Sequence, residues 1–248
     1  MKKVILITGG SDGIGMSTAY LAFSHDYIVC INYLKNQDSA NKIVADINSK
    51  GGQAFAFQAD ISKEEAVVKL FRSIDEQAGP IFALVNNAGI IEPQQKLSEM
   101  SLARLQKVFG TNVFGSFLCA REAIKRMSVK NGGKGGSIVN ISSMAAQHGS
   151  PFEYVDYAST KGAIDTMTIG LSKEVADDKI RVNAVRPGII ETNIHGKAGE
   201  PNRVERMKEL IPMKRGGQPE EVAKTILWLL SDDASYITGA IVNVSGGR

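Results

Sequence analysis

Tyr157 and Lys161 stand four residues apart and could together move a proton. The segment that follows repeats apolar residues at helical spacing, so both side chains are expected on one face of a helix. An ammonium group held near a phenol favours the ionised phenol and lowers its pKa. A tyrosine with a lowered pKa can exchange protons near neutral pH, which is general acid–base chemistry. Such a pair arises often by chance, so its meaning depends on the motifs that accompany it.

A glycine-rich turn follows directly after the apolar run Val4 to Ile7, with glycines at positions 9, 13 and 15. Glycines permit a tight turn and a close approach of pyrophosphate to the backbone, and the helix that follows offers free N–H donors at its start. We therefore predict a dinucleotide site here. A plain strand-to-helix turn is the alternative.

Short apolar runs alternate with helix-like stretches along the rest of the sequence. Near-continuous hydrophobicity is typical of strands covered on both faces, and the alternation predicts a mainly parallel sheet with helices on both sides. The expected strands are Val4 to Ile7, Ile28 to Ile31, Ala54 to Phe57, Phe82 to Val85, Ser137 to Ile141, Ile180 to Val185 and Ala240 to Val244. The expected helices are Ile14 to His25, Ser39 to Lys50, Lys63 to Gln77, Leu102 to Met127, Tyr157 to Ala176 and Pro219 to Leu230.

The 248 residues, 43% of them hydrophobic, are expected to form one domain covering residues 1–248. Residues 189–214 show no strand pattern, and we interpret them as a lid-like excursion. The net charge of +3 argues against the basic footprint of a nucleic-acid-binding protein.

The sequence has no apolar run long enough to span a membrane, and its first residues read as a strand rather than a signal peptide. The two cysteines, Cys30 and Cys119, are expected to be buried reduced thiols rather than a disulfide or a metal site. These features predict a cytoplasmic protein.

The ordered motifs resemble those of the short-chain dehydrogenase/reductase family, in the branch whose chains have about this length. They cover essentially the whole sequence: the glycine turn, Asp60, the run Asn86 to Gly89, Asn112, Ser142 with Ser143, Tyr157 with Lys161, and Pro187 with Gly188 and Thr192. The resemblance implies a Rossmann-type, doubly wound α/β fold with a seven-stranded sheet of order 3-2-1-4-5-6-7. It also implies an enzyme that interconverts an alcohol and a ketone or aldehyde with NAD(P)(H). Similar sequences are glucose-dehydrogenase-like or 3-oxoacyl-carrier-protein-reductase-like, but no single residue here selects a substrate.

The resemblance assigns the catalytic group to Asn112, Ser143, Tyr157 and Lys161. Tyr157 would exchange the proton, Ser143 would hold the substrate oxygen, Lys161 would lower the Tyr157 pKa, and Asn112 would hold a water in a proton relay. The interval from Ser143 to Tyr157 is one residue longer than the commonest spacing in the family, which leaves Ser142 as an alternative. No metal is expected.

The cofactor is expected to be NADP(H), with NAD(H) as the alternative. An acid at the end of the second strand would bind a free ribose diol, but that strand ends without one, and Lys35 could meet a 2′-phosphate. Against this, Asp12 stands where phosphate-binding relatives often carry Arg or Lys. Asp60 would meet the adenine amino group or only cap the next helix. The expected cofactor-binding residues are Gly9, Ser11, Asp12, Gly13, Ile14, Gly15, Asn32, Tyr33, Lys35, Asp60, Ile61, Asn86, Ala88, Gly89, Tyr157, Lys161, Pro187, Gly188 and Thr192.

The expected partners are a small carbonyl or alcohol substrate and further copies of the chain, in a homotetramer or dimer. A non-catalytic dinucleotide sensor or scaffold is the rival hypothesis, and it would show a broken catalytic group, whereas all four positions are filled. Enoyl reductases of the superfamily have six residues between Tyr and Lys, unlike Tyr157 and Lys161. Tyr154 has Ala at position 158 and is set aside. His148 and His195 are expected to be solvated, with a position facing the substrate as the alternative.

Overall fold

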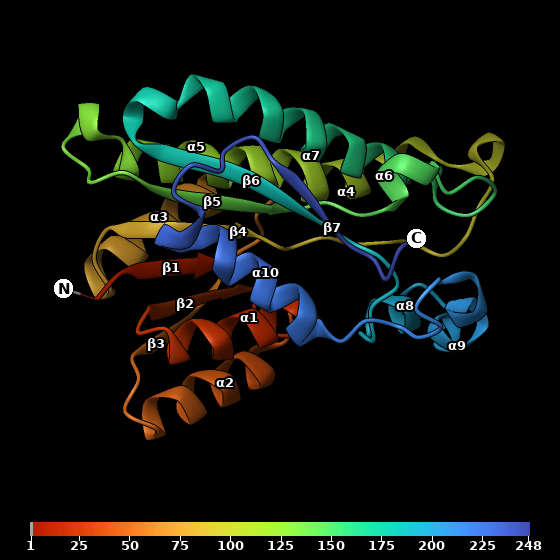
Figure 1. Ribbon diagram of the computed structural model, residues 1–248, viewed down its shortest axis with the longest axis horizontal. Helices are drawn as coiled ribbons and strands as arrows, with labels where there is room; N and C mark the ends of the chain where they lie inside the picture. Colours follow the sequence, from red (N-terminus) through yellow and green to blue (C-terminus); the bar gives the residue numbers. More distant parts are fainter. Residues whose placement is uncertain (1) are drawn as a thin grey trace.

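The computed structural model describes residues 2–248 and contains a sheet of seven parallel strands (Figure 1). The spatial order is β3-β2-β1-β4-β5-β6-β7, so the chain winds outward in both directions from the central pair β1 and β4. Both the fold class and the strand order predicted from the sequence are confirmed. The strands are β1 (Val4–Ile7), β2 (Ile28–Tyr33), β3 (Ala54–Gln58), β4 (Ile81–Asn86), β5 (Gly136–Ile141), β6 (Ile180–Pro187) and β7 (Ile241–Val244).

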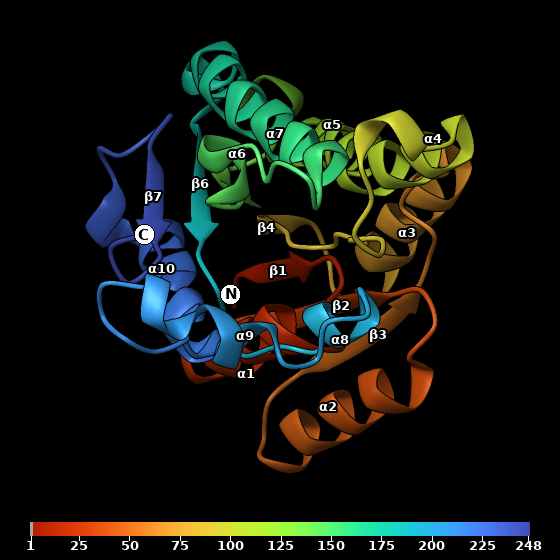
Figure 2. The ribbon, with the colours of Figure 1, turned by 90° about the vertical axis from the view of Figure 1, so that its right-hand side faces the viewer.

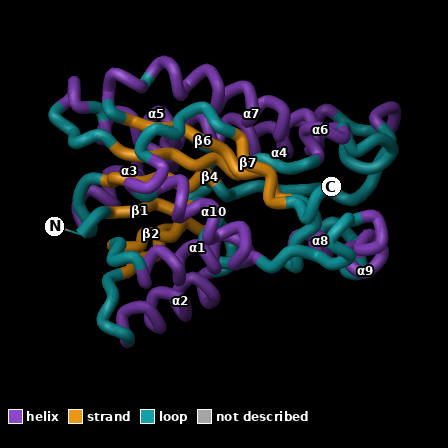
Figure 3. Tube along the Cα trace, viewed as in Figure 1, coloured by secondary structure: helices purple, strands orange, loops and turns teal. Residues whose placement is uncertain are grey.

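Helices cover both faces of the sheet, as Figures 2 and 3 show. Helices α1, α2 and α10 lie on one face, and α3, α5 and α7 lie on the other. Short helices α6, α8 and α9 lie beyond the carboxyl ends of the strands, at the right of Figure 1. The helices are α1 (Gly13–Ser24), α2 (Gln37–Ser49), α3 (Glu64–Gln77), α4 (Leu102–Phe109), α5 (Gly115–Met127), α6 (Ala145–His148), α7 (Val155–Glu174), α8 (Ile194–Lys197), α9 (Arg203–Met207) and α10 (Pro219–Leu230).

The core consists of two apolar layers separated by the sheet. In β1, Ile5 and Ile7 pack against the layer of α1 and α10, while Val4 and Leu6 pack against that of α3 and α5. Side chains alternate between the faces of a strand, so a strand covered on both sides must be apolar throughout. This explains why the strands could be found from continuous apolar runs.

The two cysteines lie in this core. Cys30 and Cys119 are fully buried and unpaired, and burial raises the pKa of each thiol to about 12. The expectation of buried reduced thiols is therefore confirmed. No helix within residues 2–248 combines the length and the apolar character needed to cross a bilayer.

The single long helix expected over Leu102 to Met127 is interrupted, which corrects the sequence interpretation. A π-helical turn, η2 (Gly110–Phe114), separates α4 from α5. The wider turn contains the buried Asn112. Wide turns of this kind occur often at functional sites, and side-chain periodicity does not reveal them.

The burial of Phe71 generates a stability prediction. Phe71 lies on α3 with no exposed surface, and the Arg126 guanidinium lies 5.1 Å from its ring centroid. Replacing it by alanine removes contacts and leaves a cavity, so Phe71→Ala should lower the free energy of unfolding by about 3–5 kcal/mol. Urea denaturation measures this difference. Tyr236→Ala, at a fully exposed ring, is the control and should change little; an equal loss in both would contradict the assigned core.

Candidate functional site

One large cleft of about 1500 Å³ opens over the carboxyl ends of the strands. It is bounded by the loops that follow β1, β2, β3, β4, β5 and β6. Parallel strands direct all these loops to one edge of the sheet, and the reversal of strand order beside β1 leaves a crevice there. The cleft exceeds the 300–1000 Å³ typical of pockets for one small ligand, so it has room for a dinucleotide and a substrate together.

The glycine turn forms the floor of one half of the cleft. Gly9 and Gly13 have φ values of +62° and +51°, which side chains other than glycine rarely adopt. A Cβ on Gly15 would lie 2.5 Å from the Gly9 carbonyl oxygen, so this glycine serves close packing within the turn. Helix α1 begins at Gly13, whose N–H donates to Asp12 Oδ1 at 2.8 Å, and the N–H groups that follow it form the kind of anion site that suits a pyrophosphate. The turn therefore fits a dinucleotide.

Two residues that the sequence analysis did not select hold the glycine turn against β4. The Asn87 side-chain amide donates to the carbonyl oxygens of Thr8 and Gly9 at 2.9 and 3.1 Å. The Thr8 hydroxyl accepts from the backbone N–H groups of Asn87 and Ala88, each at 3.0 Å. Thr8 directly precedes the glycines and Asn87 lies inside the Asn86 to Gly89 motif, so the same two motifs predict that both residues lie at the site.

Most of the expected cofactor-binding residues line the cleft, and three do not. Tyr33 is buried among the apolar side chains beneath α1 and α2, and Gly15 lies behind the turn. Asn86 is also buried, and its amide donates to Asn140 Oδ1 at 2.9 Å and to the Ser116 carbonyl at 3.2 Å. The expected residues that line the cleft are Gly9, Ser11, Asp12, Gly13, Ile14, Asn32, Lys35, Asp60, Ile61, Ala88, Gly89, Tyr157, Lys161, Pro187, Gly188 and Thr192.

Asn32 and Asp60 organise the far wall of the cleft. The Asn32 amide donates to the Ala59 carbonyl at 3.0 Å and ties the end of β2 to the end of β3. Asp60 Oδ1 accepts from the N–H and hydroxyl of Ser62, at 3.0 and 2.7 Å. It does not cap α3, which begins at Glu64 without a side-chain cap. Lys35, just beyond β2, is exposed and also lines this side of the cleft.

Helix α7 brings Tyr157, Lys161 and Ser143 together at the other half of the cleft. The Lys161 ammonium lies 5.5 Å from the Tyr157 ring centroid and donates to the Ile141 carbonyl at 2.7 Å. The Ser142 hydroxyl is buried and donates to the Lys161 carbonyl at 3.2 Å. Ser143, in contrast, is partly exposed; its hydroxyl accepts from the Ala145 N–H at 3.1 Å, and it lies near enough to Tyr157 to affect the pKa of the phenol.

Asn112 does not line the cleft but supports its wall. Its Oδ1 accepts from the Ile90 N–H at 2.8 Å, and its Nδ2 donates to the Ile90 carbonyl at 3.0 Å and to Thr160 Oγ1 at 3.2 Å. All the contacts of this side chain are therefore structural. Asn112 Oδ1 and Lys161 Nζ both face Gly89, where a Cβ would lie 3.6 and 3.5 Å from them.

The pKa directions at this centre differ from the sequence expectation in one respect. Burial raises the pKa of Tyr157, and the interaction with Ser143 opposes that rise. Burial also lowers the pKa of Lys161 to about 8, against the raising influence of Asp165. Without a bound cofactor, the pKa of Tyr157 therefore lies above its ordinary value, and Lys161 loses its positive charge at a lower pH than an exposed lysine does. The reason is desolvation, which penalises both charged forms.

The excursion over residues 189–214 lies across both halves of the cleft. Lys197 Nζ on α8 lies 2.9 Å from Asp12 Oδ2, and Asn193 donates to Asp12 Oδ1 at 3.2 Å. Farther on, Arg203 on α9 donates to Glu153 at 2.6 Å, beside the start of α7. The excursion therefore touches the glycine turn at one end and the Tyr157 helix at the other.

Several residues at the outer end of the cleft were not expected. Arg203 stacks 5.0 Å from the Tyr154 ring, and both side chains are buried. His195 is not solvated as expected: its Nε2 lies 3.1 Å from the Ile190 carbonyl, and burial lowers its pKa. His148 is exposed, as expected, and also lines the cleft. Only the fold brings these residues together, since they come from segments with no common motif.

Known proteins resemble this chain over its whole length. A family model described as enoyl-(acyl carrier protein) reductase matches residues 9–248. An oxidoreductase of Escherichia coli K12 named YgfF and described as uncharacterized is 55% identical over 245 residues, covering 99% of each chain. The chain belongs to the short-chain dehydrogenase/reductase family. The family predicted from the motifs is confirmed, and it is a family of oxidoreductases.

Other relatives carry the two names expected from the sequence. Glucose 1-dehydrogenase 2 of Bacillus subtilis is 40% identical, with 99% of this chain and 94% of that protein covered. The 3-oxoacyl-[acyl-carrier-protein] reductase FabG of Staphylococcus epidermidis is 34% identical, with 100% and 99% covered.

Solved structures match the fold closely. A short-chain type dehydrogenase/reductase from Mycobacterium marinum superposes with a TM-score of 0.92 at 31% identity, covering 99% of this chain and 94% of that one. A blue fluorescent protein from a metagenomic library, solved with NADPH, has a TM-score of 0.89 at 30% identity and covers 99% and 97%.

The lowered pKa of Lys161 predicts a dependence of stability on pH. An unfolded lysine titrates near 10.5 and the folded one near 8, so the cost of burying the cation is fully present below pH 8 and fades as the pH rises toward 10.5. Between pH 8 and 9.5 the parent should gain about 1–2 kcal/mol of unfolding free energy relative to Lys161→Met. Denaturant titrations of both proteins across this range measure the difference. Parallel pH profiles would show that Lys161 titrates alike in both states.

Proposed function

We propose that the protein is an NADP(H)-dependent oxidoreductase that interconverts a small alcohol and the corresponding ketone or aldehyde. The observation that carries the proposal is the placement of Tyr157, Ser143 and Lys161 in the same cleft as a glycine turn suited to pyrophosphate. The cleft has space for a substrate beside the tyrosine. The dinucleotide, when bound, donates or accepts a hydride at its nicotinamide ring.

Each residue of the reacting centre has a role that follows from its contacts. Tyr157 gives a proton to the substrate oxygen during reduction and takes it back during oxidation. Ser143 holds that oxygen; its hydroxyl faces Tyr157, whereas the Ser142 hydroxyl is occupied by the Lys161 carbonyl. These are donors already in place for the charge that develops on the oxygen.

Lys161 supports Tyr157 in this proposal. Its ammonium lies beneath the tyrosine ring and can also meet the ribose hydroxyls at the same wall. A positively charged nicotinamide ring would favour the Tyr157 phenolate further, which offsets the raised pKa of the protein alone. Asn112 fixes the wall that faces Lys161, and through that wall it positions any water in a proton relay.

Removing the Tyr157 hydroxyl tests the proposed chemistry. Tyr157→Phe should reduce turnover by about 100- to 10,000-fold, the range found when a general acid–base group is lost. The affinity for the dinucleotide should stay within about twofold, because the ring and its packing are kept. A panel of carbonyl and polyol substrates, followed by the absorbance of the reduced nicotinamide, measures the rates.

Tyr154→Phe is the matched control, since Tyr154 lies on the same cleft three residues earlier and its hydroxyl has no partner among the described residues. It should keep most of the turnover. Equal rates for parent and Tyr157→Phe on a verified substrate would refute the assigned proton donor.

The preference for NADP(H) rests on Lys35 and the absence of an acid at the end of β2. Lys35 lines the cleft next to Asn36, which precedes the start of α2. The α2 N-terminus has no side-chain cap, so its N–H groups add to the attraction for a phosphate. Asp12 opposes this charge, but Lys197 pairs with it.

A charge reversal at position 35 tests the cofactor choice. A charge-assisted hydrogen bond contributes about 1.5–3 kcal/mol, so Lys35→Glu should weaken NADPH binding by at least about tenfold. NADH binding should weaken by less than about threefold, because NADH has no 2′-phosphate and a glutamate there can accept hydrogen bonds from its free ribose diol. The fluorescence of the reduced dinucleotide suits this titration; Trp228 lies on α10 outside the cleft and is a poor reporter. Tighter NADH binding by the parent would overturn the preference.

The remaining features are proposed on the same footing. The substrate is a small carbonyl or sugar-like compound, as the name of the Bacillus subtilis relative suggests. Exposed apolar side chains on α5 and α7, such as Phe117 and Ile169, suit a homotetramer or dimer. We further propose a single domain over residues 1–248, a lid formed by residues 189–214, and a cytoplasmic location.

A further inference from the structure

A buried ion pair adjoins Tyr157 without belonging to the proposed reacting group. Nε of Arg104, on α4, lies 2.7 Å from Asp156 Oδ2, and its Nη2 lies 3.4 Å from Asp156 Oδ1. Only 10% of the Arg104 side chain and 1% of the Asp156 side chain are exposed. A forked contact of this kind fixes direction as well as distance. The ion pair therefore fixes the orientation of the first turn of α7 relative to α4.

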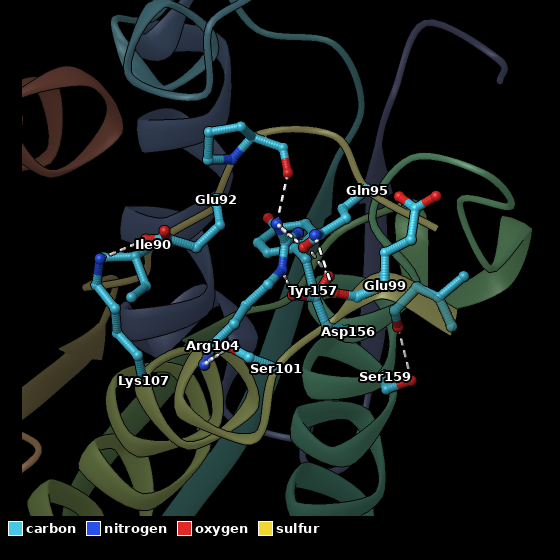
Figure 4. Close-up of polar contacts among 12 residues, drawn as sticks. Ile90, Glu92, Gln95, Glu99, Ser101, Arg104, Lys107, Asp156, Tyr157 and Ser159 are labelled. Atoms are coloured by element: carbon cyan, nitrogen blue, oxygen red, sulfur yellow. Dashed lines mark hydrogen bonds and ion pairs between the residues drawn. The ribbon is translucent and has the colours of Figure 1, made fainter. Parts of the chain in front are cut away.

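The same guanidinium also holds the opposite wall of the cleft. Arg104 Nη1 donates to the Pro93 carbonyl at 2.6 Å and to Gln95 Oε1 at 3.3 Å (Figure 4). The segment that leads to Pro93, residues 89–92, lines the cleft. One side chain thus joins the wall of the cleft to the helix that carries Tyr157.

Two more residues, one on α4 and one in the π-helical turn that follows it, contact residues 89–92. Lys107 Nζ lies 2.7 Å from Glu92 Oε1, and Figure 4 draws this ion pair. The Asn112 side-chain amide forms hydrogen bonds with both the N–H and the carbonyl of Ile90. Arg104, Lys107 and Asn112 therefore hold successive points of the wall from one helical stretch. Among them, only Arg104 also reaches α7 through an ion pair.

Tyr157 needs such support because of its place in the helix. Helix α7 begins at Val155, so Tyr157 is its third residue, within the turn whose N–H groups lack partners inside the helix. Tyr154, at the cap position, makes no side-chain cap hydrogen bond. A helical end without a cap opens more readily than the interior. The Asp156 carboxylate suits the positive end of the helix, and Arg104 ties it to α4.

We propose that Arg104 is a positioning residue for the reaction. Through Asp156 and the Pro93 carbonyl it keeps the Tyr157 hydroxyl and the wall formed by residues 89–92 at a fixed separation. The inference rests on the proposed function, because it assigns Arg104 a part in the same chemistry. Buried ion pairs contribute little net stability compared with apolar pairs, whereas a small misplacement of reacting groups slows chemistry strongly.

The decisive variants separate orientation from stability. Arg104→Gln should lower kcat, counted per dinucleotide-binding site, by about 10- to 100-fold, while the dissociation constant of the dinucleotide stays within about twofold. Arg104→Lys keeps one charge and should recover part of the rate. The double variant Arg104→Met with Asp156→Leu should melt near the parent temperature, because an apolar pair replaces the ions, yet keep the low kcat.

The control is Arg126→Gln, which removes a similarly buried guanidinium away from the cleft; its Nη1 lies 3.1 Å from Glu122 Oε2, and 5% of the Glu122 side chain is exposed. Arg126 Nε lies 2.8 Å from Asp75 Oδ2, with 17% of the Arg126 side chain exposed. This variant should lower the melting temperature and leave kcat unchanged. Parent-like kcat in Arg104→Gln, or full recovery of kcat in the double variant, would overturn the inference and leave the pair a structural one.

Hydrogen exchange distinguishes this inference from the proposed function. Amides of residues 153–161 should exchange at least about tenfold faster in Arg104→Gln than in the parent, and no faster in Arg126→Gln. If the parent reduces no carbonyl compound but this exchange pattern holds, the proposed function fails and the positioning of the helix stands. Unchanged exchange in these residues would overturn the positioning even in an active enzyme.

Discussion

The burial of one ammonium group determines the arrangement of the proposed reacting centre. Lys161 is 4% exposed, and its Nζ donates to the carbonyl oxygen at the end of β5. The Ser142 hydroxyl returns a hydrogen bond to the Lys161 carbonyl, so α7 and β5 are joined in both directions. A cation removed from water must be held by nearby oxygens, and this requirement fixes α7 against the carboxyl edge of the sheet. Tyr157, one turn earlier, takes its place over the cleft as a consequence.

The wall facing this lysine is constrained equally closely. A Cβ at Gly89 would lie in ordinary van der Waals contact with both groups, 3.5 Å from Lys161 Nζ and 3.6 Å from Asn112 Oδ1, so this glycine faces the lysine and the asparagine together. Asn112 lies in the π turn and holds Ile90 through both backbone groups. Arg104 donates further hydrogen bonds to the Pro93 carbonyl and to the Asp156 carboxylate. The result is a cleft whose two sides are held by one helical stretch.

The proposed reacting centre and the outer end of the cleft belong to different parts of the molecule. Tyr157, Lys161 and Ser143 are fixed by the sheet edge and α7, and the family assignment applies to this part. The outer end is made by the excursion, where Arg203 meets Glu153 and Glu200 at 2.6 and 2.8 Å. These charged residues can be replaced by others without disturbing the sheet, because they lie outside it. Members of one fold family can carry out different functions through sites built on the same architecture.

The strands, the glycine turn and the Tyr157–Lys161 pair could be predicted from the residues alone, and the strand order from the resemblance to the family. Strands covered on both faces must be continuously apolar, and turns that approach a ligand require glycine, so both leave local signals. The π turn at Asn112, the inward position of Asn86 and the ion pair of Arg104 with Asp156 were decided only by the tertiary structure. Each depends on contacts between residues far apart in the chain, as do Arg203 over Tyr154 and Lys197 on Asp12. Local periodicity carries no information about such contacts, because they arise only when packing brings the segments together.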